Sequence, residues 1–259
     1  MSLETTIAGL VKACNDLTGA VSGQLGKIDA KLSEAFAQFT AWRQSVQAKD
    51  INGRASYSQV IDLTGLSTSI FYPVWWTMPG NEEGETEVVI SRLFSRDSEL
   101  QPFGAGVIHI AGLNLHVEGC GFPWNGDANY LAVKRISQTY RETVRQIRFG
   151  MLSIARKVTG TKPLYFGGVD GQMTDCSTAS GCYLRGGLSY TVTKSFKEPV
   201  KYSRLDNEVL VDQVVGTDNE IAWYVKPYQV TDPVLGTAYE ESRIAYTQDL
   251  DKRYAAKGA

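Results

Sequence analysis

The sequence predicts a mainly β, sandwich-like head preceded by an N-terminal α-helical coiled-coil stalk. In the first 46 positions, apolar residues recur at intervals of 3 and 4, which is the heptad pattern of a coiled coil. After a polar segment, the pattern changes to short β-branched and aromatic runs separated by glycine, which is typical of strands. These observations divide the chain into a stalk (1–48), a hinge (49–56), a head (57–230) and a C-terminal tail (231–259).

The apolar residues of the stalk define one seam. Its members are Ile7, Leu10, Cys14, Leu17, Val21, Leu25, Ile28, Leu32, Ala35, Phe39, Trp42 and Val46. One additional interval of 4, between Val21 and Leu25, is a stutter in the heptad pattern. Gly19, Gly23 and Gly26 surround it, and since each glycine costs about 1 kcal/mol inside a helix, we expect the helix to loosen there. The seam predicts self-association but leaves two or three chains open, and a helix packed on the chain's own head is the alternative.

The polar segment 48–55 (AKDINGRA) is the expected hinge, and the strands follow it. The predicted strands are 57–63, 69–77, 87–94, 107–117, 188–194, 208–215 and 221–228. Within 107–117 the apolar set shifts by one position after Ile110, which predicts a β-bulge at Ala111 and Gly112. The polar, alanine-ended residues from about Asp232 onward predict a loosely held tail.

The segment 133–158 supports two interpretations. Its apolar residues, beginning with Val133, Ile136 and Tyr140, keep helical spacing. The segment is also rich in valine, isoleucine, threonine and tyrosine and contains Gly150, which suits strands better. We favour strands.

Charge and composition exclude several classes of partner. A formal net charge of −2 gives no general attraction to nucleic acid or to an anionic membrane. No apolar run approaches the roughly 20 residues that span a bilayer, and the first residues lack the layout of a signal peptide. The cysteines Cys14, Cys120, Cys176 and Cys182 form no CxxC pair, so we expect reduced thiols and assembly in a cytoplasm.

The sequence predicts no metal, no cofactor and no catalytic activity. The two histidines, His109 and His116, lie on one predicted strand about 20 Å apart, too far to share an ion. There is no GxSxG elbow and no phosphate-binding loop. Asp127, Asp170 and Asp175 lie in glycine-rich loops and are the candidates for a glycosidase pair, although turn residues of this kind are more often structural.

A basic run occupies the same segment as the ambiguous strands. It comprises Lys134, Arg135, Arg141, Arg145, Arg148, Arg156 and Lys157. Such a run can meet phosphate on nucleic acid or lipopolysaccharide. We favour a solvated face that is offset by acids elsewhere, namely Glu82, Glu83, Glu85 and Glu87.

The expected ligand-binding surface consists of two loops. In the segment 119–130 (GCGFPWNGDANY), aromatic rings stand beside asparagine and aspartate, a combination that covers the apolar side of a pyranose and bonds its hydroxyls. The predicted glycan-binding residues here are Trp124, Asn125, Asp127 and Tyr130. The long loop 167–181 adds Asp170, Gln172 and Asp175. The alternative is that the aromatic residues of the first loop cover the core of the head.

Three stretches resemble phage tail-fibre and tailspike proteins. LVKACNDLT at 10–18, which continues to LGKID at 25–29, is similar to the helix that precedes fibre heads in that group. SGCYLRGGLSY at 180–190 resembles a strand–turn–strand near the end of many such heads, and FYPVWW at 71–76 is similar in character. The short start before the helix suggests a C-terminal fragment of a longer fibre.

The resemblance implies a homotrimer in a virion tail fibre, with an all-β head that binds a bacterial surface polysaccharide or lipopolysaccharide. It also implies that Arg185, Gly186 and Gly187 are structural. The chain lacks the repeated short strands of a parallel β-helix, which disfavours a glycan-degrading tailspike. Two interpretations compete with a receptor-binding fibre tip: a stalked bacterial adhesin, and a structural tail component without a receptor.

Overall fold

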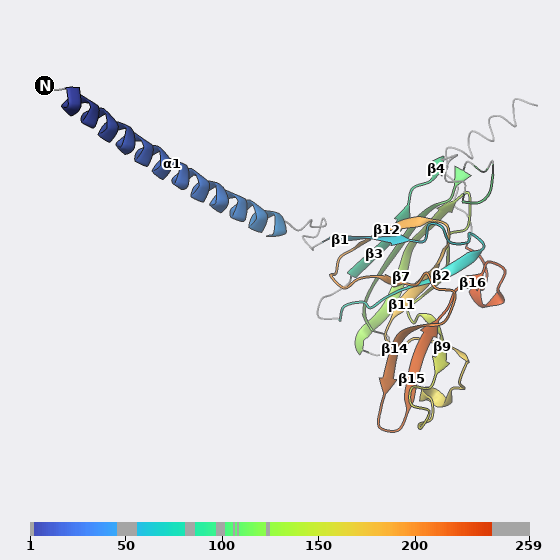
Figure 1. The fold of residues 1–259 in the computed structure, drawn as a ribbon. Coiled ribbons are helices and arrows are strands. Elements are labelled where there is room, and N and C mark those ends of the chain that lie inside the picture. The colour runs from blue at the N-terminus through green and yellow to red at the C-terminus, as the bar shows by residue number, and fades with distance from the viewer. Residues whose placement is uncertain are drawn as a thin grey trace, which may run out of the picture. The chain divides into compact units, whose positions relative to one another are not determined.

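The computed structural model describes residues 3–45, 56–80, 86–96, 102–105, 107, 109–122 and 125–239 (Figure 1). The chain divides into two compact units, Met1–Lys49 and Asp50–Ala259. The first unit is helical and the second is built from β-strands. We describe each unit by itself.

The first unit is one helix, α1 (Leu3–Ser45). It is continuous through Gly19, Gly23 and Gly26, so the loosening expected at the stutter is not observed. An added Cβ at Gly19 or Gly23 would meet no atom within 4 Å, so packing within the chain does not require these glycines. A mainly β protein with one long helix is thus confirmed.

The seam of α1 is uncovered in the single chain. Ile7, Leu10, Leu17, Val21 and Ile28 are each between 50% and 68% exposed. The other seam residues whose side chains are described, Cys14 and Ala35, are also exposed. The side chains of the remaining seam members lie outside the described residues, and these members are Leu25, Leu32, Phe39, Trp42 and Val46.

The strands of the second unit pair in an antiparallel manner. They are β1 (Tyr57–Asp62), β2 (Ile70–Trp76), β3 (Thr86–Arg92), β4 (Ser95–Arg96), β5 (His109–Ile110), β6 (Gly112–Phe122), β7 (Asn125–Thr139), β8 (Val144–Arg148), β9 (Leu152–Arg156), β10 (Met173–Asp175), β11 (Ser180–Arg185), β12 (Ser189–Lys194), β13 (Lys201–Tyr202), β14 (Val209–Val215), β15 (Glu220–Val225) and β16 (Tyr228–Gln229). Two short 3-10 helices, η2 (Tyr165–Gly167) and η3 (Pro233–Leu235), join them.

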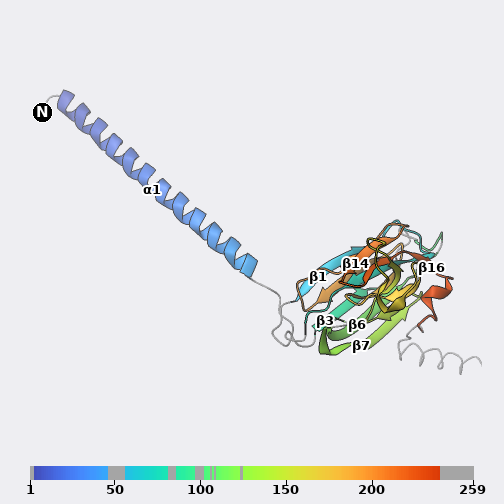
Figure 2. The ribbon, with the colours of Figure 1, turned by 90° about the horizontal axis from the view of Figure 1, so that it is seen from below.

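These strands form three main sheets. The first sheet has the order β1-β12-β3-β6-β7, and β3, β6 and β7 lie side by side in Figure 2. The second sheet has the order β13-β2-β11-β8, with β16 also paired to β2. The third sheet has the order β10-β9-β15-β14, and β4 and β5 form a small separate pair.

The second sheet is the middle layer, because β2 is buried on both faces. Tyr72, Val74 and Trp76 join a core cluster shared with the first sheet. Phe71 and Trp75, which alternate with them, join a second cluster shared with the third sheet. The sandwich-like head is confirmed, and it has three layers instead of two.

The segment 133–158 forms strands, so the helical interpretation of it is wrong. It contributes the end of β7, the whole of β8 and the whole of β9. Tyr140, in the turn between β7 and β8, has a φ of 65°, a value that lies outside the right-handed helical region. Gly150 lies in the β8–β9 connection, where an added Cβ would lie 2.9 Å from the Cβ of Asp175.

The expected shift at Ala111 is present, but a change of sheet causes it. Ala111 lies between β5, which pairs with β4, and β6, which belongs to the first sheet. Ile110, Leu113 and Leu115 are buried, as the shifted pattern requires. An added Cβ at Gly112 would lie 2.9 Å from Thr139 Oγ1, so this position allows close approach between β6 and β7.

The described part of the segment 119–130 is not a loop, in contrast to the prediction. Strand β6 continues to Phe122 and β7 begins at Asn125, and these two residues are opposite each other. Cys120 is opposite both Asn129 and Tyr130, which marks a bulge. The glycines and asparagines of this segment therefore lie in an irregular hairpin, whereas the sequence suggested an open loop.

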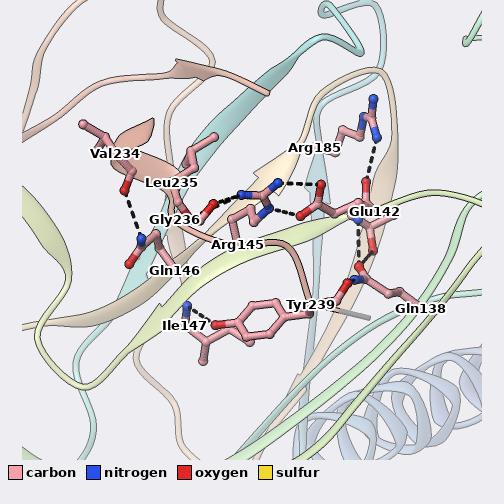
Figure 3. A network of polar contacts seen from close by, with 11 residues as sticks. Gln138, Glu142, Arg145, Gln146, Ile147, Arg185, Val234, Leu235, Gly236 and Tyr239 are labelled. Atoms are coloured by element: carbon pink, nitrogen blue, oxygen red, sulfur yellow. Dashed lines mark hydrogen bonds and ion pairs between the residues drawn. The ribbon is translucent and has the colours of Figure 1, made fainter. Parts of the chain in front are cut away.

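The tail does not begin at residue 231, because residues up to Tyr239 pack on the head. Leu235 is buried, and Arg145 donates hydrogen bonds to the carbonyl oxygens of Leu235 and Gly236. The Tyr239 hydroxyl accepts a hydrogen bond from the Ile147 amide at 3.3 Å (Figure 3). We call residues 233–239 the C-terminal strap.

Candidate functional site

Four of the predicted glycan-binding residues belong to the segment 119–130, and three of them are in β7. Trp124 is outside the described residues. Asn125, Asp127 and Tyr130 belong to β7, and their side chains are outside the described part of the chain. The prediction for these residues stays a prediction.

The other three predicted residues use their polar groups to hold their own loop. Asp170 accepts a hydrogen bond from the Lys157 amide at 3.2 Å, and the Gln172 side-chain oxygen accepts one from the Val169 amide at 3.2 Å. Asp175 forms an ion pair with Arg148 at 2.8 Å. These contacts favour a structural role for all three.

The basic run is neutralised locally, but mostly by acids other than the expected ones. The ion pairs are Lys134–Glu118 at 2.6 Å, Arg148–Asp175 at 2.8 Å, Arg156–Glu208 at 2.8 Å and the close pair Arg145–Glu142. Of the expected acids, Glu87 lies 3.8 Å from His116, and the other three are outside the described residues. The pairing supports charge balance within the head, whereas the Arg145–Glu142 pair is largely buried and does not belong to a solvated face.

The segment Arg185-Gly186-Gly187 has a structural role. Arg185 donates hydrogen bonds to the carbonyl oxygens of Thr68, at 2.7 Å, and of Glu142, at 3.0 Å. Gly187 has a φ of 78°, which favours glycine, and an added Cβ at Gly186 would overlap a carbonyl oxygen.

The described residues contain no group of three or more histidine, cysteine, aspartate or glutamate side chains arranged for a metal ion. Within the same part of the chain, no helix is long and apolar enough to cross a membrane.

A cleft with a volume of about 280 Å³ is lined by residues of the second and third sheets and of the connections next to them. We call it the inter-sheet cleft. It is lined by Trp75, Trp76, Thr77, Thr178, Ala179, Glu198, Pro199, Lys201, Val211 and Asp212. These residues come from the end of β2 and the residue after it, the residues just before β11, the β12–β13 connection, β13 and β14.

Strand pairing explains why these segments meet. Strand β13 is at one edge of the second sheet, where Lys201 lies opposite Trp75. Strand β14 is at one edge of the third sheet, where Asp212 lies opposite Trp223. The register of β14 shifts between Leu210 and Asp212, so the residue between them, which lines the cleft, is the extra residue of a bulge.

The cleft combines an apolar wall with a few polar groups. Glu198, Lys201 and Asp212 are exposed, and together they give the cleft one net negative charge at neutral pH. Two threonines add hydroxyl groups, and Thr77 donates a hydrogen bond to the carbonyl oxygen of Thr178 at 3.3 Å. This composition is typical of a site for a small polar ligand.

Buried polar atoms without hydrogen bonds gather around the cleft. They are Nε1 of Trp75, Nε1 of Trp76, Oγ of Ser180 and Nε1 of Trp223. Two of these residues line the cleft, while Ser180 is opposite Trp76 and Trp223 is opposite Asp212. An unsatisfied buried polar group costs about 1–3 kcal/mol, so four around one cleft is a concentrated cost.

The described residues contain eight such atoms in total. The remaining four belong to Arg92, His116, Glu142 and Arg145, none of which lines the cleft. Glu142 and Arg145 form an ion pair with each other, and Arg92 and His116 each have another interaction. A shallower depression of about 330 Å³, which includes Lys226, Tyr228 and Asp232, has no such atom among its lining residues. The inter-sheet cleft is therefore the stronger candidate.

Sequence reasoning missed this cleft. The only signal was the continuous apolar run at 70–76, which is typical of a strand buried on both faces. Nothing in the sequence connects that run with Glu198 or with Asp212, which approach it only through the stacking of two sheets.

Comparison of the chain with known protein families, with curated proteins and with solved structures finds no match.

Proposed function

We propose that this protein is the host-recognition part of a phage tail fibre, in which a self-associating stalk presents a β head to a bacterial surface glycan. The observation that carries the proposal is the uncovered seam of α1, joined in one chain to a separate β unit that contains a polar cleft. The sequence resemblance supports the phage context.

The energetics of the seam favour association with further copies of this chain. Burial of a large apolar side chain contributes about 1.5–3 kcal/mol. Ile7, Leu10, Leu17, Val21 and Ile28 alone therefore supply an amount comparable with the association cost of about 4–15 kcal/mol. Because the seam extends beyond these five residues, a stable assembly is expected, and the resemblance suggests three chains.

Association also serves recognition. A single saccharide site is weak, since polar groups of both partners must lose water on binding. Joining several heads on one stalk can raise the apparent affinity about 10²–10⁴-fold when they engage together. An oligomeric stalk therefore compensates for the weak affinity of each single saccharide site.

The contacts of two candidate catalytic carboxylates, Asp170 and Asp175, argue against the alternative that the protein degrades glycans. Asp170 lies 3.5 Å from Arg156, and Asp175 pairs with Arg148. These ion pairs, together with the hydrogen bond that Asp170 accepts from the Lys157 amide, give both carboxylates a structural role in the head. A recognition function without catalysis is the better explanation.

The test of self-association compares two double variants of the full chain by light scattering. Leu10→Asp/Leu17→Asp places two carboxylates in the seam, whereas Ala8→Asp/Asn15→Asp adds two at exposed positions outside it. We expect the seam variant to become monomeric and the control to keep the mass of the parent. A monomeric mass for the parent at micromolar concentration would contradict the proposal.

The test of recognition measures adsorption of fluorescently labelled protein to a panel of bacterial strains. We expect the parent and the control variant to adsorb to some strains, and the seam variant to bind these at least about 100-fold more weakly because avidity is lost. An assembled parent that adsorbs to none of the strains would count against surface recognition while leaving the stalk intact.

A further inference from the structure

We infer that the inter-sheet cleft is the saccharide site of the head and accepts a neutral or amino-bearing pyranose, an inference that rests on the proposed recognition function. The predicted site at the β6–β7 hairpin is the competing location. Four properties of the cleft lead to this assignment.

The first property is size. A volume of about 280 Å³ is just below the range of small-molecule sites, which is about 300–1,000 Å³. Such a cleft suits one sugar ring with its substituents better than an extended polymer segment. The cleft would therefore bind a terminal or branching sugar of a surface glycan.

The second property is the set of polar groups. The carboxylates of Glu198 and Asp212 are acceptors, the ammonium group of Lys201 is a donor, and the hydroxyls of Thr77 and Thr178 can be either. Sugar hydroxyls both donate and accept, so a mixed set on an apolar wall matches them. Hydrogen bonds to charged groups are also stronger than those between neutral groups.

The third property is charge. Two carboxylates and one ammonium group leave one net negative charge. This charge repels uronic acids and phosphorylated sugars, and it favours a neutral sugar or one that carries an ammonium group. The cleft thus selects against acidic glycans.

The fourth property is the group of unsatisfied polar atoms. Trp75 and Trp76 line the cleft, and their indole N–H groups have no acceptor. Ser180, opposite Trp76, and Trp223, opposite the lining residue Asp212, each add one such atom. These atoms are buried, so a ligand reaches them only through a small displacement of the covering side chains. Binding that supplies an acceptor removes a cost that the free protein bears.

The indole N–H signals in NMR spectra report sugar binding at the cleft and therefore test this inference. The chain contains five tryptophans. Trp75 and Trp76 line the cleft and Trp223 lies opposite the lining residue Asp212, and we call these three the cleft tryptophans. Trp42 and Trp124 are distant from them in sequence. The full-length protein, labelled with ¹⁵N and deuterated, is titrated with the methyl glycosides of glucose, galactose and N-acetylglucosamine, with glucosamine, and with methyl glucuronide as the acidic control. Trp→Phe variants assign each indole signal.

We expect a neutral or amino sugar to shift the signals of the three cleft tryptophans and to leave Trp42 unchanged, with no effect of glucuronide. A shift confined to Trp124 would overturn the cleft and place the site at the hairpin, while the recognition function would stand. If no sugar shifts any indole although the protein adsorbs to bacteria, the cleft is also overturned. If adsorption fails as well, the proposed function fails with it.

A matched pair of variants checks the same inference without NMR. Asp212→Asn neutralises a lining carboxylate, and Asp218→Asn makes the same change at an exposed residue in the turn between β14 and β15, which does not line the cleft. Calorimetry with the best of the five sugars should show binding at least about tenfold weaker for Asp212→Asn. The control should bind within about twofold of the parent, and both should keep its Tm. Equal affinity of Asp212→Asn and the parent would overturn the assignment.

Discussion

Replacement of Arg145 by methionine should destabilise the head by about 3–5 kcal/mol. The guanidinium donates to Glu142 at 2.9 Å and also to two carbonyl oxygens of the C-terminal strap, those of Leu235 and Gly236 (Figure 3). The side chains of Arg145 and Glu142 are only 9% and 15% exposed. Burial lowers the pKa of Arg145, so the folded protein already bears a desolvation cost that these acceptors offset.

The magnitude follows from what the substitution leaves behind. Methionine retains apolar contact but removes the partner of a carboxylate in a largely buried position. Removal of one member of a buried ion pair costs about 3–5 kcal/mol, because the other charge stays desolvated. The strap loses the two hydrogen bonds from Arg145 and keeps those from Gln138, Gln146 and Ile147, so residues 233–239 should become more accessible to protease than in the parent.

Urea unfolding of the full chain, followed by tryptophan fluorescence, measures this effect. Arg135→Met is the matched control, since Arg135 is exposed and its loss should change the free energy of unfolding by no more than about 0.5 kcal/mol. The double variant Arg145→Met/Glu142→Met should recover most of the stability, because no buried charge remains. A cost below about 1 kcal/mol for Arg145→Met alone would refute the reasoning.

Three further predictions concern acid stability, packing and assembly. The bidentate hydrogen bond from Arg156 lowers the pKa of Glu208 in the folded protein. This interaction stabilises the fold by about 1 kcal/mol or less above the ordinary glutamate pKa, and the stabilisation is lost as the pH falls through the lowered pKa. The Glu208→Gln variant, followed by thermal unfolding, should therefore lose less stability between pH 7 and pH 3 than the parent, and an identical loss would contradict this. Gly181→Ala should lower the stability by about 1–3 kcal/mol, because the added Cβ would lie 2.6 Å from the carbonyl oxygen of Val74, and an unchanged Tm would show that the strands can separate there. Cys14 is exposed on the single helix but belongs to the seam, so a water-soluble thiol reagent should react with it more slowly in the parent than in the seam variant, and equal rates would argue against a buried seam.

Several strands could be predicted because the order of apolar and polar residues along a short segment indicates a strand. Local pattern identified six strands to within a few residues, namely β1, β2, β3, β12, β14 and β15. The shift at Ala111 was also readable, although its cause was a change of sheet. Local pattern does not report which sheets stack, so the third layer was not predicted.

The site was less accessible to sequence reasoning. Glycine, asparagine and aromatic residues at 119–130 suggested a loop, but pairing between β6 and β7 uses the same residues in an irregular hairpin. Asp170 and Asp175 resembled ligand-binding residues, but each faces an arginine that sequence distance concealed. The inter-sheet cleft depends on edge strands that lie more than 100 residues apart in sequence from the Trp75–Trp76 pair, such as β13 and β14.

The most direct test of recognition is a glycan array of bacterial surface polysaccharides, probed with the purified full-length protein. The account predicts binding by the assembled parent to a subset of glycans that present neutral or amino sugars, and a strong loss of that binding for Asp212→Asn. A folded, oligomeric protein that binds no glycan on the array while adsorbing to bacteria would contradict the account and indicate a protein receptor instead.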